Sequence, residues 1–322
     1  MEFGMVSPMV VCLGEALVDR LGPLGGDPVL DNPVDDRLGG APANVACGLA
    51  RLGTAVAFLG RLGDDAIGEQ FVNLFQRRGV ETSGLQVDPD RPSRIVLVRR
   101  SLSGERQFQG FAGNRGQGFA DQALRSAPLP IRARWLLLGS IPLANAQSAV
   151  ALQSAVEQAR HQGTAIALDV NWRPTFWDAT ADPGAGPSAA AKAAMQPLLE
   201  QAALIKLARE EALWLFDADD PGVIQQALPQ RPDVVVTDGA APVRWQFAAE
   251  SGRQSAFQPL SVVDTTGAGD AFTAGLLHRW DAAPQERIRF AAACGALVCG
   301  GAGGIDPQPT EAQVEAFLGH GR

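Results

Sequence analysis

The heptapeptide Asp264-Thr265-Thr266-Gly267-Ala268-Gly269-Asp270 lies between a short apolar run and a segment in which Phe272, Leu276 and Trp280 recur every four residues. This spacing predicts a helix that begins at the glycines. The first N–H groups of a helix have no intrahelical partner and carry positive dipole character, so such a turn can bind phosphate. Because Asp270 would repel a phosphate, we interpret it as a base that takes a proton from the attacking group. The alternative is a capping Asp after a flexible turn.

Composition limits the classes of function. The chain has 322 residues, of which 46% are hydrophobic and 19% are charged, as expected of an ordinary globular protein. Its formal net charge of −8 argues against a nucleic-acid-binding or anionic-membrane surface. An acidic protein that binds an anionic ligand must supply positive charge locally. We therefore expect individual Arg and Lys residues and helix N-termini to form the site.

The cysteines and histidines predict neither a disulfide framework nor a His-ligated metal. The four cysteines show no CxxC spacing, and we expect free thiols in a reducing cytoplasm. The three histidines are scattered. Residues 1–9 show no basic region followed by a long apolar run, so we expect no signal peptide, and no apolar run is long enough for a membrane span.

Short apolar runs alternate with helical patterns along most of the chain, which predicts an α/β fold with a mainly parallel sheet. We interpret residues 1–322 as one domain, with a loop at 179–190. The expected strands are 10–13, 55–59, 135–138, 164–170, 203–207 and 233–236, and a Gly/Asp-rich loop is expected at 60–68. The expected helices include 147–160, 285–299 and 310–318.

Two segments interrupt this alternation. One, at about 15–38, is rich in Asp, Gly and Pro, and the other, at about 92–112, resembles a hairpin around a Ser-Leu-Ser-Gly-Glu turn. If the two segments pair, they form a small β-sheet beside the main sheet. Such a sheet is placed to act as a lid that excludes water from a reactive phosphate.

The chain resembles the ribokinase-like (PfkB) family of carbohydrate kinases. One matching motif is Gly39-Gly40-Ala41-Pro42-Ala43-Asn44-Val45-Ala46, and the other is Asp264-Thr265-Thr266-Gly267-Ala268-Gly269-Asp270. Two complex motifs in the right order are specific, and the resemblance extends from Val10 to about Phe317. It implies a three-layer α/β/α fold with a central, mainly parallel sheet and a small β-sheet lid.

The resemblance also implies catalytic roles. Asp270 is expected to deprotonate a sugar hydroxyl that attacks the γ-phosphate of ATP. The amides of Gly267, Ala268 and Gly269 are expected to form the anion hole. Arg173, within an Asp169–Trp177 run that resembles the fructokinase and 2-keto-3-deoxygluconate kinase branches, is expected to contact the phosphate or the substrate. The alternative for Arg173 is an ion pair with Asp169 or Asp178.

For the sugar, the resemblance implies Asp19, Gly39, Gly40 and Asn44, since glycines admit a polyol to the backbone and Asn both donates and accepts. The alternative is a tight turn with a structural Asn. Arg106 and Phe108 are expected to close over the sugar from the lid, or merely to pack there. Glu15 is interpreted as an exposed lid-strand residue.

For the nucleotide, the resemblance implies ATP with Mg²⁺, bound through six residues. Glu211 is expected to arrange metal-bound water, although Ala208 stands where the family usually has Asn. Asp264 and Thr266 are candidate ligands for a monovalent cation such as K⁺, a question that the sequence leaves open. The expected nucleotide-binding residues are Lys206, Thr237, Gly239, Gly267, Gly269 and Gly295.

The sequence therefore predicts an ATP-dependent sugar kinase, with fructokinase as the first choice. A 2-keto-3-deoxygluconate kinase would need a cationic partner for the substrate carboxylate, and Arg94, Arg99 or Arg106 could serve. A catalytically silent, kinase-shaped regulatory protein is the alternative from another class. We expect small-molecule partners only, no nucleic acid or membrane, and either a monomer or a homodimer formed through the lid.

Overall fold

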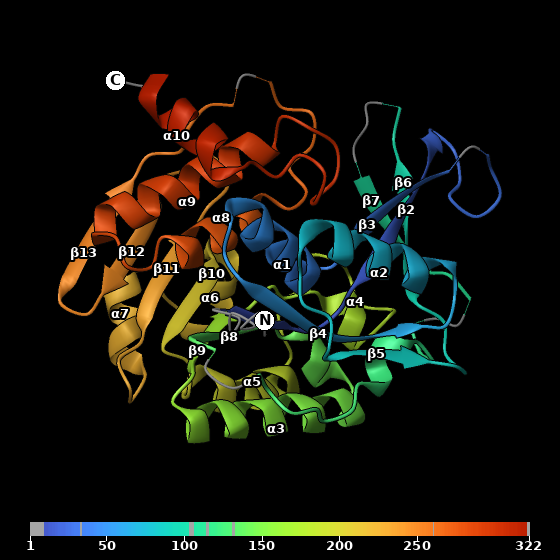
Figure 1. Cartoon of the computed structure of the whole chain (residues 1–322), viewed down its shortest axis with the longest axis horizontal. Helices are drawn as coiled ribbons and strands as arrows, with labels where there is room; N and C mark the ends of the chain where they lie inside the picture. The colour runs from blue at the N-terminus through green and yellow to red at the C-terminus, as the bar shows by residue number, and fades with distance from the viewer. Residues whose placement is uncertain are drawn as a thin grey trace, which may run out of the picture.

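The computed structural model describes residues 10–32, 34–102, 106–113, 116–130, 133–259 and 261–320. A nine-stranded sheet runs through the molecule in the order β13-β12-β11-β10-β9-β8-β1-β4-β5 (Figure 1). Its strands from β5 to β11 are parallel, and β12 and β13 add an antiparallel edge. The strands are β1 (Val10–Leu13), β4 (Val56–Gly63), β5 (Leu85–Asp88), β8 (Trp135–Leu138), β9 (Ala165–Asp169), β10 (Leu204–Ala208), β11 (Asp233–Thr237), β12 (Val243–Phe247) and β13 (Glu250–Gln254).

Helices cover both faces of this sheet because its parallel strands alternate between two cores. In β1, Val10 and Cys12 face one core, and Val11 and Leu13 face the other. The first core is covered by α1 (Ala41–Leu52), α2 (Ala66–Arg78), α8 (Ala268–His278), α9 (Pro284–Val298) and α10 (Glu311–His320). The second is covered by α3 (Ala146–Gln162), α5 (Ala189–Leu199), α6 (Arg209–Phe216) and α7 (Pro221–Ala227). Shorter helices are η1 (Ala120–Ala123), η2 (Ile141–Ala144) and α4 (Pro174–Trp177).

A second sheet of four strands stands beside the first, at the upper right of Figure 1. We call it the small sheet. Its order is β3-β2-β6-β7, and β2 pairs in parallel with β6. It consists of β2 (Leu17–Leu24), β3 (Asp35–Gly39), β6 (Arg94–Arg100) and β7 (Arg106–Phe111), so its strands fall within the two segments that interrupt the sequence pattern.

The predicted α/β fold is confirmed, and the expected strands and helices agree with the structure to within a few residues. The expected loop at 60–68 is wrong in its first half, because β4 continues to Gly63. Three short strands were not predicted: β5, β12 and β13. The signal for β12 was present, since Val243, Trp245 and Phe247 alternate as buried residues. All four cysteines are free, and three are buried, while Cys299 is partly exposed.

No helix in the described part of the chain is long and apolar enough to cross a membrane.

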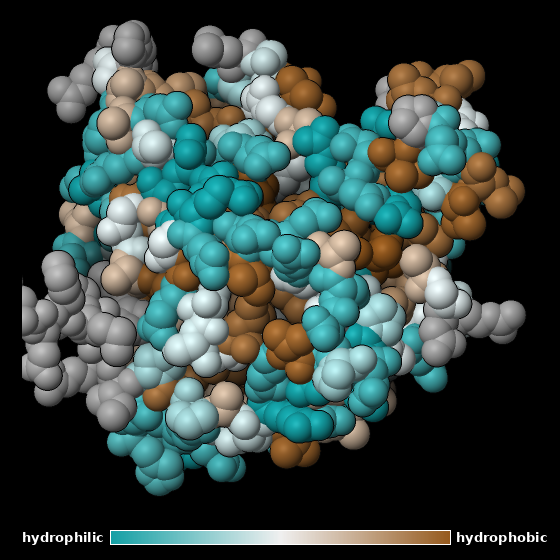
Figure 2. All heavy atoms as spheres, turned by 45° about the vertical axis from the view of Figure 1, so that its right-hand side comes forward, coloured by the Kyte–Doolittle hydropathy of each residue, from teal (hydrophilic) through white to brown (hydrophobic). Residues whose placement is uncertain are grey.

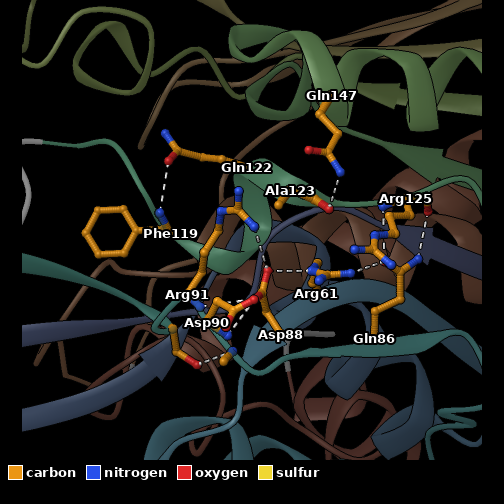
Figure 3. A network of polar contacts seen from close by, with 12 residues as sticks. Arg61, Gln86, Asp88, Asp90, Arg91, Phe119, Gln122, Ala123, Arg125 and Gln147 are labelled. Carbon is orange, nitrogen blue, oxygen red and sulfur yellow. Dashed lines mark hydrogen bonds and ion pairs between the residues drawn. The ribbon is translucent and has the colours of Figure 1, made fainter.

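A buried ion pair connects the ends of β4 and β5 (Figure 3). Arg61 Nε donates to Asp88 Oδ2 at 2.8 Å, and the Asp88 side chain is fully buried. Burial alone would raise the pKa of Asp88, but the Arg61 guanidinium and the amides of Asp90 and Arg91 hold that pKa at about 2. This carboxylate therefore stabilises the fold above the pKa of an unfolded Asp, ~3.9, and the stabilisation is lost as the pH falls towards 2.

We predict that Asp88→Asn lowers the free energy of unfolding by about 3 kcal/mol, because it leaves Arg61 buried without its counter-charge. Urea unfolding at pH 7 measures the change. Asp90→Asn is the control, since Asp90 is exposed and makes its contact through the backbone. Equal stability of the two variants would contradict the prediction.

Candidate active site

Close backbone packing and the Asp264 carboxylate fix the turn at the N-terminus of α8, at the carboxyl edge of the large sheet. Gly267 adopts φ 77°, and a Cβ there would lie 2.5 Å from Gly304 Cα, so only glycine fits. Asp264 Oδ1 accepts from the Thr266 amide (3.0 Å) and hydroxyl (2.8 Å). Its Oδ2 accepts from the Gly303 amide at 2.8 Å. The turn and the 303–304 loop are therefore tied together by one carboxylate.

Asn44 and Asp270 meet although they are 226 positions apart in the chain. Asn44 Nδ2 donates to Asp270 Oδ2 at 2.7 Å, and the Asn44 carbonyl accepts from Gln308 Nε2 at 2.7 Å. Burial raises the pKa of Asp270 to about 6, the hydrogen bond from Asn44 opposes the rise, and the charge of Asp169 adds to it. A carboxylate with this pKa is mostly ionised at neutral pH and still basic enough to accept a proton.

A cavity of about 480 Å³ opens between this turn and the small sheet. Eleven of the residues predicted from the sequence line it: Asp19, Gly40, Asn44, Phe108, Arg173, Lys206, Glu211, Thr266, Gly267, Gly269 and Asp270.

Gly39 does not line this cavity but lies next to it, since a Cβ there would be 3.8 Å from Asp19 Oδ2. The side chain of Arg106 is outside the described part of the structure. The Ala268 amide donates to the Thr265 carbonyl at 3.2 Å, so of the three predicted anion-hole amides it alone has a partner within its own turn.

Lys206 lies at the floor of the cavity, beneath the α8 N-terminus. Its Nζ donates to Asp169 Oδ1 at 3.1 Å, and a Cβ on Gly269 would lie 3.1 Å from that Nζ. Asp169 Oδ2 accepts from the Thr273 hydroxyl at 2.9 Å. Burial alone would lower the pKa of Lys206, but Asp169, Glu211 and Asp270 raise it above its ordinary value, so the ammonium stays charged.

Arg173 reaches the cavity from the residue before α4, and its Nη1 donates to the Trp172 carbonyl at 2.9 Å. In the described part of the chain, Arg173 forms no ion pair with Asp169 or Asp178, so the alternative role is not observed. Asp169 is occupied by Lys206 and Thr273, and Asp178 accepts from the Thr180 amide and hydroxyl. The guanidinium therefore faces the cavity with donors to spare for an anion.

The interpretation of Glu15 as an exposed residue is wrong. Glu15 is 3% exposed, lines the cavity and accepts from the Ala41 amide at 3.1 Å. Burial raises its pKa to about 8. Glu15 precedes β2 and packs against Gly40, where a Cβ would lie 2.6 Å from the Glu15 carbonyl oxygen.

Two of the three arginines offered as partners for a substrate carboxylate are engaged elsewhere. Arg94 is 2% exposed, pairs with Asp121 at 2.8 Å and lies against three phenylalanine rings. Arg99 pairs with Asp27 at 2.7 Å. Besides Asp19, the small sheet presents apolar side chains to the cavity: Leu17, Val96, Val98 and Phe108.

A second cavity, of about 320 Å³, lies on the other side of the α8 N-terminus. Thr237, Gly239, Ala268, Gly269 and Gly295 line it, so the predicted nucleotide residues other than Lys206 and Gly267 gather here. Thr265 and Gly269 line both cavities, which therefore meet at the glycine turn. Apolar residues form most of its remaining wall: Ala240, Val243, Phe257, Pro259, Val262, Phe272, Ala292 and Ala296.

Sequence reasoning missed several residues of the first cavity. Asn171 follows β9 with φ 44°, a left-handed conformation that is uncommon for a residue other than glycine. Its position in the D-x-N-x-R run was a signal for it. Ile141 and Pro183 reach the cavity from η2 and from the 178–187 loop, and no local pattern distinguished them.

The pfkB family carbohydrate kinase model matches residues 7–311 of this chain. The chain is 34% identical to the probable chloroplastic fructokinase-6 of Arabidopsis thaliana over 97% of this chain and 83% of that protein. The structure is similar to the fructokinase of Xylella fastidiosa with bound ATP, at a TM-score of 0.81 and 29% identity, covering 97% and 98% of the two chains.

A fructokinase of Vibrio cholerae, in a form bound to fructose, ADP and calcium, is similar at a TM-score of 0.79 and 29% identity, covering 97% and 99% of the two chains. These matches extend over the large sheet, the small sheet and both cavities. The fold is thus the ribokinase-like α/β fold, and the chain belongs to the pfkB family of carbohydrate kinases.

Proposed function

We propose that this chain is a fructokinase, which transfers the γ-phosphoryl group of ATP to fructose and forms fructose 6-phosphate and ADP. The observation that carries the proposal is the hydrogen bond between Asn44 and Asp270 in the first cavity, where Asp270 follows Gly269, a residue that lines both cavities. A sugar in the first cavity would have a hydroxyl beside a basic carboxylate. The names of the relatives, among which fructokinases predominate, support fructose as the sugar.

In the proposed reaction, the 6-hydroxyl oxygen of fructose attacks the γ-phosphorus. The O–H bond breaks and Asp270 takes the proton, an O–P bond forms, and the bond from the γ-phosphorus to the bridging oxygen breaks, so its electron pair leaves with ADP. Asn44 orients Asp270 through the bond to Oδ2 and leaves Oδ1 for the sugar. Asp19, Gly39, Gly40 and Phe108 would hold the sugar.

The negative charge that develops on the phosphoryl group needs donors fixed in advance. The amides of Gly267 and Gly269, at the α8 N-terminus, supply two. Ala268 would take part only by giving up its bond to Thr265. Lys206 and Arg173 add two cations on the same side of the cavity.

We infer that ATP occupies the second cavity, with its base between Thr237, Gly239 and Gly295 and its phosphates at the shared glycine turn. Within the described residues, no group of three or more His, Cys, Asp or Glu side chains could hold a metal ion. Mg²⁺ bound by ATP phosphates and water fits such a site, and when bound it neutralises phosphate charge. Asp264 and Thr266, with the 300–304 loop, remain our proposed K⁺ site.

The cavity favours fructose over 2-keto-3-deoxygluconate. The described part of the small sheet contributes apolar side chains and the acidic Asp19 to the cavity, and Arg94 and Arg99 are paired with Asp121 and Asp27. Among the described side chains, the cations that line the cavity are Arg173 and Lys206, which both act on Asp270. The presence of Asp270 and the anion-hole glycines argues against a silent homologue.

We further propose that residues 1–322 form one domain in which the small sheet, at about 15–38 and 92–112, acts as a lid. The first cavity supports this, since residues of both sheets line it. Apolar atoms, drawn in brown, gather at the upper right of Figure 2. Leu24 in β2, Leu30 between β2 and β3, and Leu102 after β6 are exposed apolar residues of the small sheet and its loops. These exposed residues support a homodimer formed through the lid over a monomer.

We propose a cytoplasmic protein that binds no nucleic acid or membrane.

The pKa of Asp270 predicts the pH profile. Because the base must be ionised, kcat/KM for fructose should fall roughly tenfold per pH unit below a pH of about 6. Asn44 lowers the pKa of Asp270, so Asn44→Ala should move this acid limb to higher pH and reduce kcat at pH 7 by roughly tenfold. Initial rates between pH 5 and 9 measure both effects. Asn73→Ala, at an exposed position of α2, is the control. An unshifted acid limb in Asn44→Ala would overturn the coupling.

A substrate panel tests the function itself. We expect fructose to exceed 2-keto-3-deoxygluconate, ribose and adenosine by at least about tenfold in kcat/KM, when ADP release is followed with ATP as donor. Asp270→Asn should reduce fructose turnover by at least about 1,000-fold, because no other group at that position accepts the proton. Asp90→Asn should leave it unchanged. Turnover in Asp270→Asn within about tenfold of wild type would contradict the role of the base.

A further inference from the structure

Glu211 connects the two loops that leave β9 and β10. It lies in the first turn of α6 and is 6% exposed. Its Oε1 accepts from the Trp172 amide at 2.6 Å, and its Oε2 accepts from the Ala208 amide at 2.7 Å. Both oxygens of one buried carboxylate are thus occupied by backbone donors from different loops, and such charge-assisted bonds are short and strong.

The backbone of Trp172 connects Glu211 to Arg173, which lines the cavity. Its amide is held by Glu211, and its carbonyl accepts from Arg173 Nη1 at 2.9 Å. The residue before it, Asn171, has φ 44°, a left-handed conformation that Asn adopts more readily than most residues. The backbone therefore turns just before Trp172, and the bond from Glu211 holds the chain at that turn.

We propose that Glu211 is a positioning residue for phosphoryl transfer, which fixes Arg173 at the phosphate end of the cavity through the Trp172 peptide. The proposal rests on the proposed function, in which Arg173 stabilises the transferring group. It assigns Glu211 a role different from arranging metal-bound water, and the two roles have different experimental consequences.

The variant Glu211→Gln distinguishes the positioning of Arg173 from the arrangement of metal-bound water. A glutamine keeps the size of the side chain but has one terminal acceptor in place of two, so one of the two amides loses its partner. We expect kcat for fructose to fall roughly tenfold, with the KM for fructose and the Mg²⁺ concentration at half-maximal rate unchanged. Glu210→Gln, at the exposed neighbouring position of the same helix, is the matched control and should behave as wild type.

A double-mutant cycle with Arg173→Ala locates the effect. Arg173→Ala should lower kcat by at least about 100-fold, and adding Glu211→Gln to it should cost less than about twofold, because there is no longer a guanidinium to position. Additive losses would overturn the proposal, and so would an increased requirement for Mg²⁺ in Glu211→Gln.

Hydrogen exchange followed by mass spectrometry gives a readout that does not depend on turnover. In Glu211→Gln, peptides covering 170–176 should exchange at least about tenfold faster than in wild type and in Glu210→Gln, while peptides covering β8 should be unchanged. Unchanged exchange at 170–176, or an increase throughout the sheet, would overturn the proposal. If wild type phosphorylated no sugar, the proposed function would fail, and exchange alone would decide whether Glu211 holds this loop.

Discussion

The hydrogen bond from Asn44 to Asp270 is the contact on which the arrangement of the site depends. It joins the first turns of α1 and α8, two helices that pack on the same face of the large sheet. The close approach behind it depends on glycine: a Cβ on Gly304 would lie 2.7 Å from Asn44 Nδ2, and one on Gly267 would lie 2.5 Å from Gly304 Cα. Three segments from different parts of the chain therefore stack with no room for side chains. This stacking leaves the carboxylate half-buried in the cavity wall, and the partial loss of water raises its pKa and makes it a useful base.

Charge is distributed across the cavity in a way that suits transfer from an anionic donor to a neutral acceptor. Lys206 and Arg173 line the cavity near enough to Asp270 to lower its pKa, and Lys206 Nζ lies next to Gly269 of the glycine turn, whereas the small sheet contributes apolar side chains and Asp19. The positive charge of the cavity therefore comes from two side chains near the proposed base. The buried pair of Lys206 with Asp169 keeps the Lys206 ammonium charged and oriented, because each ion has its partner within hydrogen-bonding distance.

The carboxylates near the active site have different roles because their surroundings differ. Asp270 is held by one side-chain amide and remains available to the cavity, whereas Asp264 and Glu211 are occupied by backbone donors and hold loops together. A residue's type and motif position therefore do not establish whether it acts on the substrate or on the backbone. The number of hydrogen bonds that each oxygen already accepts is the more informative observation.

The sequence by itself determined the fold class, the strand-helix alternation and the small sheet, because local periodicity encodes backbone conformation directly. The family resemblance, carried by two motifs, also identified eleven of the residues that line the first cavity. Only the tertiary structure decided the burial of Glu15, the pairing of Arg94 with Asp121 and the engagement of Glu211 by two loops. These depend on contacts between segments far apart in the chain, where a side chain's partner is set by packing and has no signature in neighbouring residues.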